Sequence, residues 1–239
     1  MGIISRFPAG ATKPYIEEIY NSDGQLIDVK MYGYETIRDY AFYNCFDLAL
    51  TTLPSGITNI GMSAFAGCSS LALTTLSSGI TTIGSTAFSG CSSLALTALP
   101  SGITTISDFA FENCASLALT ALPSGITTIS DYAFYYCASL ALTTLPSGIT
   151  NIGAGAFSNC TNLALTSLPS GIISIGTYAF AGCSNLVSLT FEGTPENIWE
   201  GAFADCNNLT TINVPWAEGA VANAPWGATN ATINYGYTG

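Results

Sequence analysis

The chain has 239 residues, of which 49% are apolar, and this composition suits one domain with a sizeable core and excludes wholesale disorder. Only 8% of the residues are charged, histidine is absent and the formal net charge is −11, which disfavours nucleic acid as a partner. Serine, threonine and glycine interrupt every apolar run before it reaches the about 18 residues of a membrane helix, so no membrane insertion is expected.

Residues 1–36 are predicted to form an N-terminal cap. Two segments, 15–20 and 25–29, flank the turn-forming residues 21–24 in the manner of a β-hairpin. The first eight residues lack the basic and apolar regions of a Sec signal peptide. The location therefore stays open between the cytoplasm, a virion and an extracellular surface reached by a non-Sec route.

A repeat of 23 residues dominates residues 37–215. Isoleucine, an Ala-Phe pair and cysteine each recur eight times in phase. In the unit 71–93 the first leucines alternate as in a strand, a turn and a short β-branched run follow, and the Ala-Phe-x-x-Cys segment is predicted to be one helical turn. Five units carry Pro-Ser-Gly at the turn, where proline presets φ and glycine supplies a positive φ.

A unit this small cannot bury its own apolar side chains, so the units must stack and share one core. Strands about 4.8 Å apart would then build an elongated body. The predicted fold is an α/β repeat, a right-handed solenoid of eight 23-residue coils with one parallel β-sheet and short helical turns, capped at both ends.

Residues 216–239 follow the repeats and are predicted to form a C-terminal cap or tail. An open solenoid exposes an apolar end that must be covered. The apolar side chains available in this segment are Trp216, Trp226, Ile233, Tyr235 and Tyr237.

The pattern Ile-Gly-x-x-Ala-Phe-x-x-Cys-x-x-Leu, followed by Leu and Leu-Pro, resembles the BspA-like, Treponema-type leucine-rich repeat over about residues 34–215. Units 186–191 and 209–215 are most similar to the usual strand of that family, whereas the inner units carry threonine where isoleucine or leucine is usual. The resemblance implies a non-enzymatic leucine-rich-repeat solenoid that binds host surfaces, matrix proteins or other partners. Residues 214–235 are similar to the tails of repeat proteins encoded by gut bacteria and their phages.

The cysteines stand one coil apart. Neighbouring Cβ atoms near the strand spacing of about 4.8 Å would be farther apart than the about 3.8 Å typical of a disulfide, and the closely spaced ligand pairs of zinc sites are missing. We expect a ladder of buried, reduced thiols that act as small hydrophobes, with disulfides or metal binding as the alternative. The ladder comprises Cys45, Cys68, Cys91, Cys114, Cys137, Cys160, Cys183 and Cys206.

No catalytic residue, metal site or cofactor is predicted. Serine has no histidine to activate it, and Lys13 and Lys30 both belong to the N-terminal cap. Asp108 and Asp131 occupy equivalent positions in neighbouring coils and are expected to cap helix N-termini. A shared proton or a Ca²⁺ site between the two carboxylates is the alternative.

Differences between the copies concentrate around the predicted helical turn. In seven of eight copies the residue before cysteine is Gly, Asn or Asp, which tolerate the left-handed conformation, and Tyr136 is the exception. Together with Phe109, Tyr132 and Tyr135 it is predicted to form an aromatic cluster. The cluster is either packing against neighbouring turns or a binding patch.

The predicted function is that of a non-enzymatic interaction or adhesion module, in which the solenoid recognises a protein or a surface glycan. The alternative is a self-assembling structural protein, because coils that are nearly identical and uncharged could associate into a filament or lattice. In that case the partner is a second copy of the chain.

Overall fold

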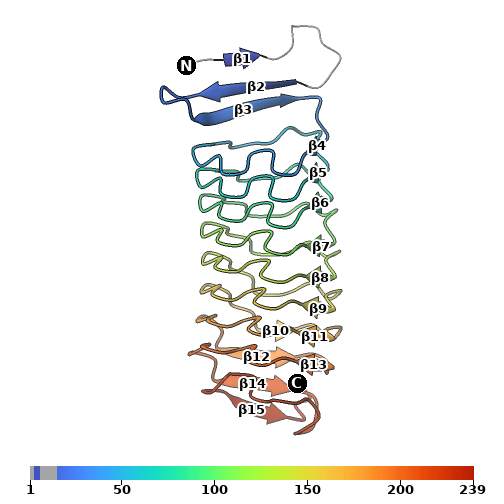
Figure 1. Ribbon diagram of the computed structural model, residues 1–239. Coiled ribbons are helices and arrows are strands. Elements are labelled where there is room, and N and C mark those ends of the chain that lie inside the picture. The colour runs from blue at the N-terminus through green and yellow to red at the C-terminus, as the bar shows by residue number, and fades with distance from the viewer. Residues whose placement is uncertain (1–2, 6–14) are drawn as a thin grey trace.

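The computed structural model describes residues 3–5 and 15–239; the rest of the predicted N-terminal cap, residues 1–2 and 6–14, lies outside the described residues. Short coils stack one upon another into an elongated body, with a small sheet at the N-terminal end (Figure 1). In the part of the chain that is described, no helix has the length and apolar character that a membrane crossing requires.

The N-terminal sheet is antiparallel, with its strands in the order β1 (Ile3–Ser5), β2 (Tyr15–Tyr20) and β3 (Leu26–Tyr32). Asn21 shapes the turn between β2 and β3, because its side-chain oxygen accepts hydrogen bonds from the amides of Asp23 and Gln25 at 3.0 and 2.9 Å. The amide of Ala49 donates to the carbonyl of Ile27 at 2.9 Å. The hairpin therefore lies against the first coil.

One side of the solenoid carries a column of two-residue parallel strands. Each strand places a polar residue outward and an isoleucine in the core, which is the alternation that the Thr-Ile and Asn-Ile pairs predict. The strands are β4 (Thr36–Ile37), β5 (Asn59–Ile60), β6 (Thr82–Ile83), β7 (Thr105–Ile106), β8 (Thr128–Ile129), β9 (Asn151–Ile152), β11 (Ser174–Ile175) and β13 (Asn197–Ile198). We call this column the isoleucine ladder.

The isoleucine ladder is interrupted once, between β6 and β7. The residue directly after β6 is Gly84, and the equivalent residue after β7, one coil later, is Ser107. The amide of Gly84 donates to the carbonyl of Ile60 at 2.8 Å, whereas at the next level it is the Ser107 hydroxyl that donates to the carbonyl of Ile83, also at 2.8 Å. A side-chain hydrogen bond thus holds the two coils together where the ladder stops.

A second parallel ladder forms only in the C-terminal coils, from β10 (Ser167–Leu168), β12 (Ser188–Phe191), β14 (Thr211–Val214) and β15 (Thr232–Tyr235). The parallel pairing is confirmed, but it is divided among separate ladders rather than forming one sheet. In the inner coils two polar residues separate Leu73 from Leu76, which breaks the alternation that a strand needs. There Leu71 and Leu73 are fully buried, but between their coil and the preceding one this segment makes a single backbone hydrogen bond, from Ala72 to Leu50 at 3.0 Å.

The predicted helical turns are not confirmed, because the Ala-Phe-x-x-Cys segments are successive turns and no helix occurs among the described residues. In every copy the residue two before phenylalanine and the residue two after it have a positive φ, which an α-helix cannot contain. The turns bond instead to the next coil: the amides of Tyr132, Phe134 and Tyr136 donate to carbonyls 22 residues further on at 2.8, 2.8 and 2.9 Å. We call this side of the solenoid the turn face.

The solenoid continues for one turn beyond the eight predicted coils. Trp226 stands where the next phenylalanine of the repeat would stand; its carbonyl accepts a hydrogen bond from the amide of Phe203 at 2.9 Å, and its side chain is buried. β15 then pairs in parallel with β14.

The core is a column of stacked rings. From Phe42 to Phe203, phenylalanines of adjacent coils lie 5.2 to 5.6 Å apart between ring centroids, and their planes are within 14° of parallel. Trp216 and Trp226 contact each other and Phe191 at the C-terminal end of this core. Each coil thus buries its ring only by sharing it with its neighbours.

Candidate functional site

The four aromatic residues that the sequence singles out lie together on the turn face. The rings of Phe109 and Tyr132 stack with centroids 5.0 Å apart, Tyr135 contacts Tyr132 edge-on at 5.5 Å, and Tyr136 contacts Tyr135 edge-on at 4.5 Å. The first three are half-buried, and Tyr136 is 47% exposed. We call these four residues the aromatic ridge.

The backbone of the aromatic ridge is held in an unusual conformation. Phe109, Tyr132 and Tyr136 have φ angles of 55°, 54° and 58°, in the left-handed region that a bulky side chain rarely adopts. The repeat places glycine at one of these two positions in other coils, as at Gly155 and Gly182. The aromatic side chains therefore occupy positions where the fold accepts a less strained residue.

Glycines in the next coil make room for two of the tyrosine rings. Tyr132 lies over Gly155 and Tyr178 lies over Gly201, and a Cβ atom on either glycine would collide with the ring. Each ring fills the space of the side chain that the glycine lacks. At these two places in the column, a glycine thus follows a tyrosine one coil later.

A recess of about 300 Å³ lies beside the aromatic ridge on the turn face. Three tyrosines, Tyr132, Tyr135 and Tyr178, line it. The remaining lining residues are Gly155, Ser158, Asn159, Ala181, Gly182 and Asp205. The ridge and the recess together form a surface in which aromatic rings lie beside a hollow that is lined mainly by small residues.

Sequence reasoning did not select Tyr40, Tyr43, Phe46 and Tyr178, which are also exposed on the turns, at 52 to 57%. Tyr40 and Tyr43 contact each other edge-on, and Tyr43 lines a second recess of about 380 Å³ near the N-terminal end. The available signal was the column two before phenylalanine, in which Tyr40 and Tyr178 align with Phe109 and Tyr132.

Carboxylates flank the aromatic ridge, and two of them bond to the following coil. Asp108 Oδ1 accepts a hydrogen bond from the amide of Asp131 at 3.2 Å, and Asp131 Oδ1 accepts one from the amide of Ala154 at 2.7 Å. They cap amides of the neighbouring coil and not helix N-termini, because the described residues contain no helix. The described residues contain no group of three or more His, Cys, Asp or Glu side chains that could hold a metal ion.

Glu112 and the tyrosines complete the electrostatic surroundings. Glu112 Oε2 accepts a hydrogen bond from the Ser89 hydroxyl at 2.8 Å. Partial burial, followed by the neighbouring Tyr136 and Glu112, raises the pKa of Tyr135. The ridge is therefore a neutral aromatic surface in acidic surroundings.

The eight cysteines form a column inside the coils, and all are free thiols. From Cys68 to Cys206, each Sγ atom donates a hydrogen bond to the carbonyl of the phenylalanine 26 residues earlier, at 3.0 to 3.1 Å. Burial raises the pKa of Cys68 to about 12 and that of Cys206 to about 11. Each buried thiol thus links two coils.

Comparisons with known proteins agree with this architecture. The sequence profile described as BspA type Leucine rich repeat region (6 copies) matches residues 35–164 and 127–218. A search of curated proteins found no significant match.

Three solved structures of bacterial proteins are similar to this chain. A leucine-rich repeat protein from Bacteroides ovatus has a TM-score of 0.67 and 24% identity over 84% of this chain and 52% of its own, so this chain spans about half of its length. The T. pallidum leucine rich repeat protein TpLRR is 28% identical over 80% of this chain and 86% of its own, with a TM-score of 0.49. The pneumococcal vaccine antigen PcpA is 21% identical over 84% of this chain and 60% of its own, also with a TM-score of 0.49.

The family profile covers more than half of the chain, and the residues that it matches include the stacked coils from β5 to β13. The Bacteroides ovatus structure shows the same fold. The chain therefore belongs to the BspA-type leucine-rich repeat family.

Proposed function

We propose that this chain is a non-catalytic recognition module that binds a protein or a surface glycan through the aromatic ridge and the recess beside it. The observation that carries the proposal is that Phe109, Tyr132 and Tyr136 hold partly exposed rings on left-handed backbone. Strained residues persist where the surrounding structure enforces them, and they cluster at binding sites.

The chemistry of the ridge suits recognition. Tyrosine gives a large contact area at a low entropy cost, and its hydroxyl stays available for hydrogen bonds. Aromatic residues that partner atoms can cover are the commonest residues to dominate binding energy at interfaces. The flanking carboxylates of Asp108, Glu112 and Asp131 favour a neutral or basic ligand surface over an acidic one.

The leucine side of the inner coils carries fewer features that a partner could recognise. On the leucine side of the inner coils, Thr75, Ala98, Ala121 and Thr144 occupy one repeated position, and all are small and exposed. A specific partner needs a difference between coils to fix its register, and this column provides almost none. This contrast supports the proposal that recognition uses the turn face.

Self-assembly is the second candidate, and the C-terminal edge favours it. β15 is the last strand of its ladder, with β14 as its single neighbour, and an uncovered strand edge can pair with another chain. Multi-angle light scattering across a concentration series distinguishes the two functions. A constant mass near the 24.7 kDa of the chain supports recognition, and growth into filaments supports assembly.

An array of matrix proteins and glycans tests the recognition proposal directly. The fluorescently labelled wild type should bind a subset of the spots, and the double variant Tyr132→Ser with Tyr136→Asn should lose them. Tyr237→Ser is the matched control, because Tyr237 is 42% exposed but lies in the C-terminal segment outside the ridge. If the ridge double variant binds the same spots as the wild type and the Tyr237→Ser control, the proposal is overturned.

A further inference from the structure

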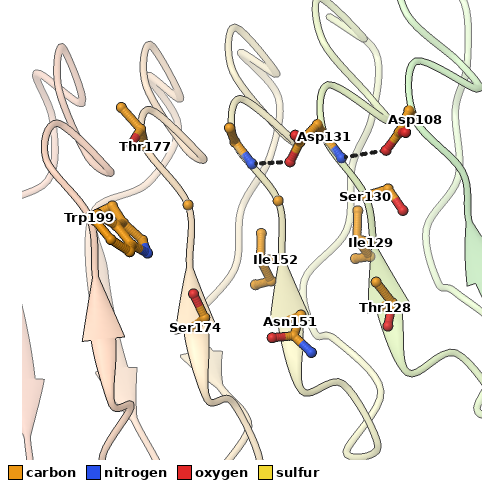
Figure 2. Close-up of a pocket in the computed structure, with 13 residues that line it drawn as sticks. Asp108, Thr128, Ile129, Ser130, Asp131, Asn151, Ile152, Ser174, Thr177 and Trp199 are labelled. Atoms are coloured by element: carbon orange, nitrogen blue, oxygen red, sulfur yellow. Dashed lines mark hydrogen bonds between the residues drawn. The ribbon is translucent and has the colours of Figure 1, made fainter.

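A second concave site lies on the isoleucine ladder, outside the aromatic ridge. It is a groove of about 500 Å³ that crosses the coils of β8, β9, β11 and β13 (Figure 2). Three coil spacings of about 4.8 Å make it about 14 Å long. It is thus an open, elongated groove whose volume lies within the size range of ligand pockets.

The floor of the groove is formed by small residues, which leave space above them. Gly153, Ala154 and Gly176 line it, and a Cβ on Gly153 or Gly176 would collide with the backbone of the preceding coil. Ala154 occupies the position at which the two preceding coils carry Asp108 and Asp131. The shortened side chain leaves a gap between Asp131 and Thr177.

One end of the groove is a tryptophan that breaks the repeat. Trp199 stands where Gly153 and Gly176 stand in the two preceding coils, and it is 53% exposed. Figure 2 shows its indole at one end of the groove, with Asp131 and Asp108 toward the other. The other two tryptophans of the chain, Trp216 and Trp226, are buried, with 6% and 1% of their surface exposed.

The walls between these ends carry hydrogen-bonding groups. Hydroxyls of Ser130, Ser174 and Thr177 line the groove, together with the amide of Asn151. The Asp131 carboxylate also lines the groove, and its Oδ1 accepts a hydrogen bond from the amide of Ala154. No basic side chain lines the groove.

We infer that this groove binds a neutral oligosaccharide, with one sugar ring packed on the Trp199 indole and the next ring over the Gly153–Ala154–Gly176 floor. A sugar ring has an apolar face of C–H groups and a rim of hydroxyls, which matches an exposed indole beside serine, threonine, asparagine and aspartate. Because the groove carries two carboxylates and no basic side chain, it repels sialylated and sulfated glycans. Asp108 and Asp131 lie beside both sites, but Trp199 and the Gly153–Ala154–Gly176 floor belong to the groove alone, so the inference stands apart from the function proposed above.

The repeat itself supplies variants that the fold tolerates. Trp199→Ser removes the indole, and serine already occupies this position at Ser107 and Ser130. Ala154→Met fills the gap in the floor, and methionine occupies that position at Met62. Val187→Ser is the control, because Val187 is 58% exposed and does not line the groove.

The test is a glycan array that carries neutral host-type glycans, neutral microbial and plant polysaccharide fragments, sialylated and sulfated glycans, and unrelated peptides. The wild type should retain neutral glycans, and the class retained identifies their source. Trp199→Ser should weaken retention at least about tenfold and Ala154→Met by several-fold, with Val187→Ser unchanged. The best soluble trisaccharide fragment should also shift the wild-type tryptophan emission to the blue, because Trp199 is the exposed indole.

Preference for anionic glycans or peptides, absence of neutral glycan binding, or equal retention by Trp199→Ser and Ala154→Met overturns the inference. The ridge double variant Tyr132→Ser with Tyr136→Asn is applied to the same array. Loss of neutral glycans by the Trp199 and Ala154 variants but not by the ridge variant supports the groove whatever becomes of the ridge. Loss by the ridge variant alone supports the ridge and overturns the groove.

Discussion

Replacement of Phe134 by alanine removes a ring from the middle of the core column. Phe134 is fully buried and stacks on Phe111 and Phe157, with centroids 5.5 Å away on both sides. Truncation of a buried phenylalanine costs about 3 to 5 kcal/mol through lost transfer energy and the cavity left behind. Because stacked contacts on both sides are lost, we expect a value near the upper end, about 5 kcal/mol.

Two further variants calibrate this number. Phe42 is the first phenylalanine of the column and, among the described residues, stacks on Phe65 alone, so Phe42→Ala should cost about 1 kcal/mol less than Phe134→Ala. Phe46 is 57% exposed, so Phe46→Ala should change the stability by no more than about 0.5 kcal/mol.

Urea unfolding followed by circular dichroism measures the three variants against the wild type. We expect Phe134→Ala to lose the most unfolding free energy, Phe42→Ala less and Phe46→Ala the least. An unfolding free energy for Phe134→Ala within about 1 kcal/mol of the wild type would show that the ring column is not the core.

Three more predictions concern the thiols and the turn. Iodoacetamide should label eight cysteines in the denatured, unreduced chain, as judged by intact mass, and a mass that reveals two or more disulfides would refute the reduced ladder. Stability should fall as the pH rises from the ordinary thiol pKa of 9.0 toward about 11, because the unfolded chain releases protons that buried thiols such as Cys68 and Cys206 retain. Cys137→Ala should reduce that slope by about 1.4 kcal/mol per pH unit, and an unchanged slope in urea titrations would contradict the burial argument. Tyr136→Asn should leave the unfolding free energy unchanged or raise it by up to about 1 kcal/mol, since asparagine tolerates φ near 58°; a loss above about 2 kcal/mol would mean that the ring is a packing element.

The repeat made the architecture predictable from sequence. Residues such as Phe134 and Cys137 recur every 23 positions, so their stacking into columns follows from the period alone. The helical turn was expected because apolar residues spaced three apart also suit a helix. The left-handed φ at Tyr132 is not signalled by its residue type; Gly155 and Gly201 in the same column were the available hint.

The candidate sites were predictable to different degrees. The aromatic ridge could be found because Tyr136 departs from the Gly, Asn or Asp of its column. The groove could not, because its shape depends on three small residues from two coils and on Trp199 from a third. Trp199 in a column of mostly glycine and serine marks the place in retrospect.

Dissociation constants test whether the aromatic ridge binds the partner. Surface plasmon resonance on the strongest protein or glycan partner from the array compares the wild type with the Tyr132→Ser, Tyr136→Asn double variant. We expect a dissociation constant at least about tenfold higher for the double variant, with its unfolding free energy preserved. Equal dissociation constants for the two proteins would contradict the claim and return the rings to a packing role.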